Sequence, residues 1–188
     1  MKKILTILLL SIFTLPFVAA QDNVFLVGDK VVNLGIGLGS TLYSGSYYKS
    51  SVPPVSISFE KGILDGILEK GVVGVGGYLG YASYKSEYAF FGDTYGWKYS
   101  NLIVGARGSF HYPLVDKLDT YGGLILGFNI ASSKGYGDYG TYSDPYSGGG
   151  LVFSPYVGGR YFFSEKFAAM AELGYGISYL NIGISIKL

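Results

Sequence analysis

The feature that most constrains this chain is a period-2 alternation of apolar residues with small or polar ones, repeated in eight successive segments. Successive side chains of a β-strand point to opposite faces, so this period predicts strands with one apolar face. The segments are about 9 to 12 residues long, the length that a tilted strand needs to cross a bilayer. Without the residues that flank them, the apolar positions of these segments run, in chain order, over Val32–Leu38, Val55–Phe59, Val73–Tyr81, Leu102–Tyr112, Leu124–Ile130, Phe153–Tyr161, Ala171–Ile177 and Leu180–Leu188. We therefore predict eight strands, with no helix between them.

The connections between these segments alternate in length. Compact linkers are expected at Lys61–Gly71, Pro113–Asp119 and Phe163–Lys166. Longer loops, rich in glycine, tyrosine and polar residues, are expected at Tyr43–Pro54, Ser83–Gly96 and Ser132–Gly150, with a short fourth member near Ser178. Short turns on one rim and long loops on the other are typical of outer-membrane barrels, which keep the turns in the periplasm.

A soluble barrel that turns its apolar face inward around a ligand, as lipocalins do, would show the same alternation. The polar face distinguishes the two, because here it carries mostly Gly, Ser, Asn and Ala, and only 14% of the chain is charged. Small residues suit the interior of an eight-stranded barrel, which is just wide enough to be filled by side chains. We therefore expect the apolar face to meet lipid, in an all-β, eight-stranded, antiparallel, up-and-down transmembrane β-barrel.

Aromatic residues of the apolar face fall into two groups by height along the strands, as amphipathic rings do at the two interfaces of a membrane. Near the short-turn rim we expect Phe59, Phe110, Tyr112, Tyr161 and Phe167. Nearer the loop rim we expect Tyr81, Phe128, Phe153 and Tyr175.

The first twenty residues have the layout of a secretory signal peptide: a Met-Lys-Lys start, an apolar run from Ile4 to Val18, and small residues to Ala20. The run is shorter than the roughly 20 apolar residues of a spanning helix, which makes a retained membrane anchor the weaker alternative. We predict a signal peptide at residues 1–20 and one outer-membrane barrel domain at residues 21–188.

Loss of Lys2 and Lys3 leaves 12 basic and 13 acidic side chains, so no nucleic-acid partner is expected.

Cysteine is absent from the sequence. The fold must therefore hold without disulfides, and thiol catalysis and cysteine-based metal sites are excluded. Asp138 and Asp144 could hold calcium, but their spacing matches no known ligand loop. No metal and no cofactor are expected.

Several ionisable residues fall on the face of small residues, which the alternation turns inward. They are Glu60, Arg107, His111, Arg160, Glu172 and Lys187. A basic residue turned toward lipid at mid-depth costs roughly 2 to 4 kcal/mol, whereas residues that face inward can pair. We expect Arg107 and Arg160 to pair with Glu172 and Glu60, in a lumenal charge network that blocks a continuous water channel. The alternative makes the same charges a selectivity filter or a catalytic set.

His111 with Ser109 on the same face invites comparison with barrel enzymes that modify lipids. Such an enzyme needs its site on the lipid face toward the outer leaflet, whereas this pair points inward near the periplasmic rim. General acid or base catalysis also needs a partner placed by geometry. We therefore expect a structural histidine and no enzymatic activity.

The longest expected loop carries four tyrosines, Tyr136, Tyr139, Tyr142 and Tyr146. Tyrosine offers a large amphipathic contact area at low entropic cost, so these residues are candidates for a surface contact. The alternative is a surface loop that only extends its hairpin.

The whole mature chain resembles the small eight-stranded outer-membrane β-barrel family of OmpA-, OmpX- and OmpW-like transmembrane barrels. The resemblance lies in G-D-K-V-V-N-L-G-I-G-L-G at Gly28–Gly39, V-G-A-R-G-S-F-H-Y at Val104–Tyr112, and the closing run Ala171–Leu188. The last strand resembles the signal read by the barrel-assembly machinery, although Leu188 replaces the usual terminal aromatic.

The resemblance implies an outer-membrane location. It also implies contact with outer-membrane lipid and lipopolysaccharide, the barrel-assembly machinery as a partner during biogenesis, and room for a larger outer-membrane complex. It indicates architecture better than activity. A structural, surface-contact or accessory-subunit role with a side-chain-filled lumen is the leading interpretation, and a narrow channel for small or apolar solutes is the alternative.

Overall fold

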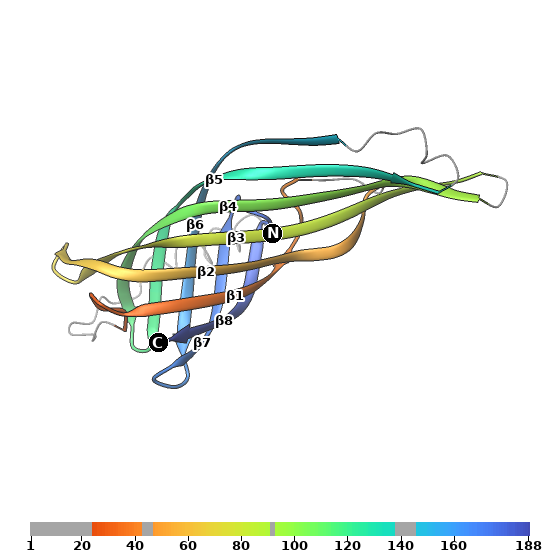
Figure 1. Ribbon diagram of the computed structural model, residues 1–188. Coiled ribbons are helices and arrows are strands. Elements are labelled where there is room, and N and C mark those ends of the chain that lie inside the picture. The colour runs from red at the N-terminus through yellow and green to blue at the C-terminus, as the bar shows by residue number, and fades with distance from the viewer. Residues whose placement is uncertain (1–23, 43–46, 91–92, 138–145) are drawn as a thin grey trace, which may run out of the picture.

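The computed structural model describes residues 24–42, 47–90, 93–137 and 146–188. The strands in this part of the chain are β1 (Lys30–Leu38), β2 (Lys49–Ile67), β3 (Gly71–Phe90), β4 (Asp93–Val115), β5 (Leu118–Tyr136), β6 (Tyr146–Phe162), β7 (Phe167–Gly174) and β8 (Leu180–Lys187). Each strand pairs antiparallel with the next, and β8 pairs with β1, so the sheet closes into a barrel (Figure 1). The predicted all-β fold with eight antiparallel strands is confirmed. The expected leader, residues 1–20, lies outside the described residues.

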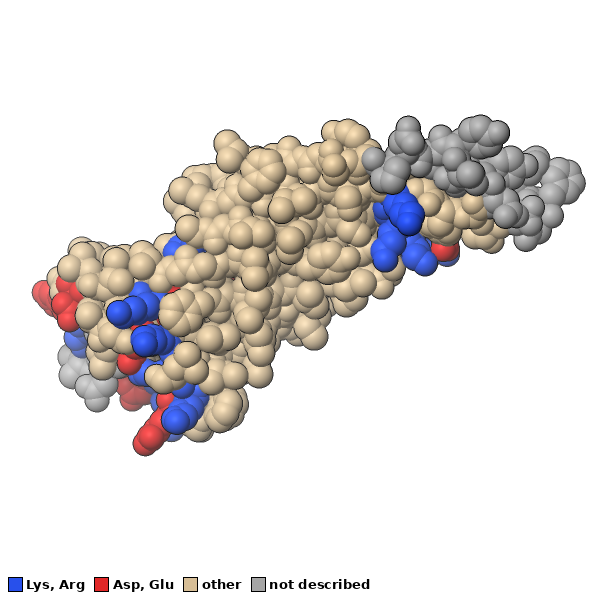
Figure 2. Space-filling view, in the orientation of Figure 1, with Lys and Arg blue, Asp and Glu red and all other residues tan. Residues whose placement is uncertain are grey.

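The alternation in sequence becomes an alternation in burial. Along β1, every second residue from Val31 to Gly37 is buried, and the residues between them are exposed or half-buried. Outward apolar side chains are open to the surroundings: Ile36 is 56% exposed, Leu126 59% and Phe153 65%. In Figure 2 the charged side chains gather toward the two ends of the visible face, and the band between them carries none. Within the four described ranges, no helix is long and apolar enough to span a membrane.

The strands on the loop side are longer than the sequence predicted. The expected loop at Ser83–Gly96 is mostly strand, because β3 continues to Phe90 and β4 begins at Asp93. Parts of the other two expected loops are also strand, namely Lys49–Pro54 in β2 and both ends of Ser132–Gly150. The ladder of backbone pairs continues from Ser83↔Ser100 to Phe90↔Asp93, although the apolar alternation ends well before Phe90. Backbone pairing does not need an apolar face, which explains the difference.

The linker at Phe163–Lys166 is as predicted, because β6 ends at Phe162 and β7 begins at Phe167. The other two linkers are shorter than expected, because backbone pairing continues into them. Most of the predicted linker at Lys61–Gly71 belongs to β2, and only Leu68, Glu69 and Lys70 turn. Leu68 and Glu69 have positive φ angles of 51° and 73°, the left-handed conformation that a tight reversal requires. Between β4 and β5 the turn is Asp116 and Lys117, and it leaves Asp119 inside a strand.

Strand lengths around the barrel are unequal. β3 and β4 have 20 and 23 residues, whereas β7 and β8 have 8 each. On the loop side, β2 to β5 therefore project beyond the closed ring as a sheet (Figure 1). The projecting part is named the extended sheet below.

Ile177 does not lie on the apolar outer face where the alternation placed it. β7 ends at Gly174, and the bend that follows breaks the period, so Ile177 turns into the barrel and has no exposed surface. There it joins a cluster of buried side chains in the upper lumen with Tyr78, Ile103 and Ile125.

Candidate functional site

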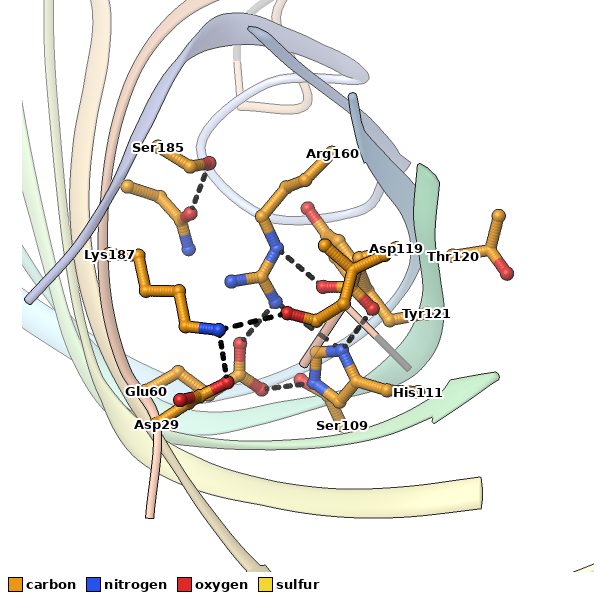
Figure 3. Close-up of polar contacts among 12 residues, drawn as sticks. Asp29, Glu60, Ser109, His111, Asp119, Thr120, Tyr121, Arg160, Ser185 and Lys187 are labelled. Carbon is orange, nitrogen blue, oxygen red and sulfur yellow. Dashed lines mark hydrogen bonds and ion pairs between the residues drawn. The ribbon is translucent and has the colours of Figure 1, made fainter. Parts of the chain in front are cut away.

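The charged residues predicted to face inward come from four strands. Glu60 lies on β2, Arg107 and His111 on β4, Arg160 on β6, and Glu172 on β7. All five are buried in the lumen. Asp119 on β5 joins them. These six residues form the lumenal charge cluster, part of which is drawn in Figure 3.

Lys187 does not belong to this cluster. Its Nζ atom lies 2.6 Å from the Asp29 carboxylate and donates to the Val24 carbonyl oxygen at 3.1 Å. The side chains of Lys187 and Asp29 are 24% and 20% exposed, so this ion pair lies at the short-turn rim. Lys187 was therefore correctly placed on the inward side of its strand but wrongly grouped with the deeper charges.

Glu60 links the two arginines. Its Oε2 atom accepts a hydrogen bond from Arg160 Nη2 at 2.9 Å and lies 4.0 Å from Arg107 Nη2. Arg107 donates to Glu172 Oε1 at 2.8 Å and to the Ser58 hydroxyl at 3.0 Å. Arg160 Nε also lies 3.0 Å from Asp119 Oδ2. Buried charges are stabilised by pairing and hydrogen bonding, and both arginines are paired here, although Arg107 Nε and Arg160 Nη1 have no hydrogen-bond partner among the described residues.

His111 lies between two carboxylates. Its Nδ1 atom is 2.8 Å from Asp119 Oδ1 and its Nε2 atom is 3.0 Å from Glu60 Oε1. Only a doubly protonated ring can donate to both acceptors. In that form the cluster holds three positive and three negative charges, and its net charge is zero.

Aromatic rings enclose the cluster. Phe25 stacks on the His111 ring with centroids 4.1 Å apart, and the guanidinium groups of Arg160 and Arg107 lie 4.5 Å from the ring centroids of Tyr121 and Tyr156 respectively. Cations over aromatic faces at this range are stabilised by the ring quadrupole. Tyr121 also donates to Glu172 Oε1 at 3.0 Å.

Little space remains beside these groups. The cavity next to Phe25 and His111 has a volume of about 10 Å³, enough for one water molecule at most. Above the charges, the upper lumen is occupied by the cluster of Tyr78, Ile103, Ile125 and Ile177. Charged and aromatic side chains thus lie in the lower lumen, and this apolar cluster lies above them.

Sequence reasoning missed Asp119, Tyr121 and Phe25. Asp119 was assigned to a linker, yet the ladder sets it directly opposite Arg160. The alternation could have placed Asp119 and Tyr121 on the inward face with Ile125, because the three positions differ by even numbers of residues. Phe25 precedes β1, outside any alternating segment, so no pattern marked it.

Ser109 and His111 do not form a nucleophile and base pair. The Ser109 hydroxyl is hydrogen-bonded to the Tyr156 hydroxyl at 2.5 Å, and both His111 nitrogens are taken by carboxylates. A serine nucleophile would need its base within hydrogen-bond reach. In the part of the chain that the structure describes, no group of His, Asp and Glu is arranged to hold a metal ion.

Two of the four candidate contact tyrosines can be placed. Tyr136 ends β5, and its hydroxyl donates to Glu87 Oε1 at 2.8 Å. Burial, followed by this hydrogen bond, raises the pKa of Tyr136 to about 12. Tyr146 begins β6 and is 68% exposed. Tyr139 and Tyr142 lie outside the described residues.

No family model and no curated protein matches the sequence. Similar solved structures include two of Ail, the attachment invasion locus protein of Yersinia pestis. The structure of Ail in complex with the heparin analogue sucrose octasulfate aligns with a TM-score of 0.52 and 12% identity, over 86% of this chain and 96% of Ail. A second structure of Ail aligns with a TM-score of 0.44, at the same identity and coverage. What the two proteins share is the fold.

Proposed function

We propose that this chain is an integral protein of the outer membrane, with a lumen closed by its own side chains and a structural, surface-contact or accessory-subunit role. The observation that carries the proposal is the inverted distribution of side chains. Arg160 and Glu60 have no exposed surface, whereas large apolar residues such as Leu126 face outward all around the barrel. Contiguous apolar surface of this extent is rare on soluble monomers and marks contact with a membrane or a partner.

The side chains that lie in the lumen support a contact role over transport. A narrow channel for small or apolar solutes remains the alternative function, and it needs a continuous path through the barrel. The Arg–carboxylate pairs and the stacked Phe25 occupy that path in the lower half, and Ile177 and its neighbours occupy it above. Opening it would require buried ion pairs to separate, which is costly.

The extended sheet supports a contact at the cell surface. It places the ends of β3, β4 and β5 well beyond the ring (Figure 1), and Tyr146, at the start of the neighbouring β6, is exposed. Ail, which shares the fold, is an attachment invasion locus protein by name, and one of its structures holds a heparin analogue. The partners that we propose are outer-membrane lipid and lipopolysaccharide, the barrel-assembly machinery during biogenesis, and a larger outer-membrane complex. We expect no enzymatic activity.

Refolding of residues 21–188 with and without detergent tests the membrane assignment. We expect a folded barrel, seen as a heat-dependent shift in gel mobility, only when detergent or lipid is present. A folded monomer in plain buffer would contradict the assignment.

Planar bilayer recordings test the closed lumen, because steady single-channel openings of the wild type would favour the channel alternative. Isolation of the native protein in mild detergent tests the accessory role through a co-purifying partner.

A further inference from the structure

Four lysines stand directly opposite one another where the extended sheet begins. Lys49 on β2 pairs with Lys85 on β3, Lys85 pairs with Lys98 on β4, and Lys98 pairs with Lys134 on β5. Directly opposite residues of an antiparallel sheet share a face, with Cβ atoms about 4.5 to 5.5 Å apart. The four side chains, named the lysine row here, therefore form one continuous line. Lys85 is half-buried and the other three are exposed.

The lysine row lies on the outer wall of the barrel. Two further rows of paired residues on the same face lead up to it. The first is the last apolar row, Tyr81, Leu102 and Ile130. The second is a serine row, Ser83, Ser100 and Ser132. Each row is two residues from the next, so the alternation keeps all three on one face. Basic side chains appear at this end of the visible outer surface in Figure 2, next to the charge-free band.

The height of the lysine row matches the headgroup layer of a membrane. Four residues of strand separate it from the last apolar row, about 13 Å along the strand, or roughly 9 Å vertically at a tilt of about 45°. The headgroup layer on one side of a bilayer is about 5 to 8 Å thick. Lysine side chains can bend back toward the apolar surface by several ångström. The amines can therefore reach the level of lipid phosphates.

The lysine row has no carboxylate partner among the described residues, and its one aromatic contact there places Lys85 Nζ 5.4 Å from the centroid of the Tyr136 ring. No described acidic side chain forms an ion pair with any of the four. Glu87 is two residues from Lys85, but its carboxylate accepts the hydrogen bond of Tyr136. Like charges placed directly opposite one another destabilise a sheet. An arrangement that repeats this repulsion across four strands suits a ligand with several negative charges.

We propose that the lysine row binds phosphate groups carried by lipids of the surrounding outer leaflet. This inference rests on the proposed membrane location. The row spans three strand spacings, about 14 Å, enough for two or more phosphates side by side. A lipid whose acyl chains cover Leu102 and Ile130 brings its phosphates to the lysines, whereas a polyanion in water could use the lysines alone. The continuity of the row with the apolar wall therefore favours a lipid.

The test compares two variants that lose the same charge. The first replaces the row: Lys49→Gln, Lys85→Gln, Lys98→Gln and Lys134→Gln. The control replaces four lysines at the short-turn rim: Lys30→Gln, Lys61→Gln, Lys117→Gln and Lys166→Gln. Each protein is folded in a neutral detergent, and binding of bis-phosphorylated lipid A is titrated by native mass spectrometry. We expect the row variant to bind at least about tenfold more weakly and the control to stay within about twofold of wild type. Lipid A without phosphates should bind wild type and row variant equally.

Three outcomes would overturn the inference. One is a row variant that binds lipid A as wild type does, and another is a control that loses binding equally, which would indicate a general charge effect. The third is a row variant that loses affinity for soluble sucrose octasulfate but keeps its affinity for lipid A, which would assign the row to a polyanion in water. The gel-mobility assay on the same samples reports the membrane assignment separately. A wild type that folds only with detergent but shows one of these outcomes leaves that assignment standing.

Discussion

Glu60 and Arg160 are 100 positions apart in the sequence, yet their side chains meet at 2.9 Å with neither exposed. The contact crosses the lumen from β2 to β6, and Glu60 is also hydrogen-bonded to His111. Replacing Glu60 by Gln removes one of the three buried negative charges and leaves Arg160 and His111 with Asp119 as their only carboxylate among the described residues. Breaking a buried pair from one side costs about 3 to 5 kcal/mol, and we expect Glu60→Gln to lower the free energy of unfolding by that amount. Urea titration in lipid vesicles measures it.

The exposed Glu165 provides the control for that prediction. Glu165→Gln should change the free energy of unfolding by less than about 0.5 kcal/mol, because surface changes away from packed features have small effects. Equal stability of Glu60→Gln and Glu165→Gln would show that the lumen is wet and the cluster loose.

Removing both partners of the Arg107–Glu172 pair should cost less than removing one. Arg107→Met alone leaves Glu172 buried with only the Tyr121 hydroxyl as a donor. Apolar replacement of a whole buried ion pair is often close to neutral. We expect the double variant Arg107→Met with Glu172→Leu to recover at least about 1 kcal/mol relative to Arg107→Met. Additive losses in this double-mutant cycle would mean that the two charges do not interact.

Phe25 and Leu26 are neighbours with opposite environments, 2% and 48% exposed. Phe25→Ala removes the ring stacked on His111 and leaves a void at the short-turn mouth. Such a truncation costs about 3 kcal/mol or more when the ring is fully packed. Leu26→Ala is the matched control and should cost less than about 1 kcal/mol. The same urea titration compares the two, and similar values would mean that the N-terminal segment is not seated in the barrel.

Leu126→Arg distinguishes lipid from water around the barrel. On a soluble protein, an outward leucine that is 59% exposed could become arginine at little cost. At the middle of a bilayer the same change costs about 2 to 4 kcal/mol, whereas Ser132→Arg, near the rim, should cost about 0 to 1 kcal/mol. The prediction fails if the two variants are equally stable in vesicles.

The number of strands and their two faces could be predicted from the sequence because the period of a strand is set by its backbone. Arg107 and His111 were assigned to the lumen by parity alone, and they lie there. Strand ends were predicted poorly, since the ladder around Lys85 and Lys98 continues without apolar residues. The prediction ended the strands where the hydrophobic signal ended.

Which charges meet was harder to predict than which face they occupy. The contact between Glu60 and Arg160 depends on the stagger of all the intervening strands, and no local pattern encodes that stagger. Asp119 was missed because the turn at Asp116 and Lys117 is two residues long, shorter than the linker assumed. The bend after Gly174 likewise reversed the face of Ile177.

Among the described strands, the wall is tall over β3 and β4 and low over the β7–β8 hairpin, which closes at Tyr175–Tyr179. Such a barrel has no rotational symmetry about its own axis. A neighbouring protein in the same membrane would meet a tall wall on the β3–β4 side and a low wall on the opposite, β7–β8 side. A partner that binds from only one side needs no special residue for this, because the uneven height of the wall already distinguishes the sides.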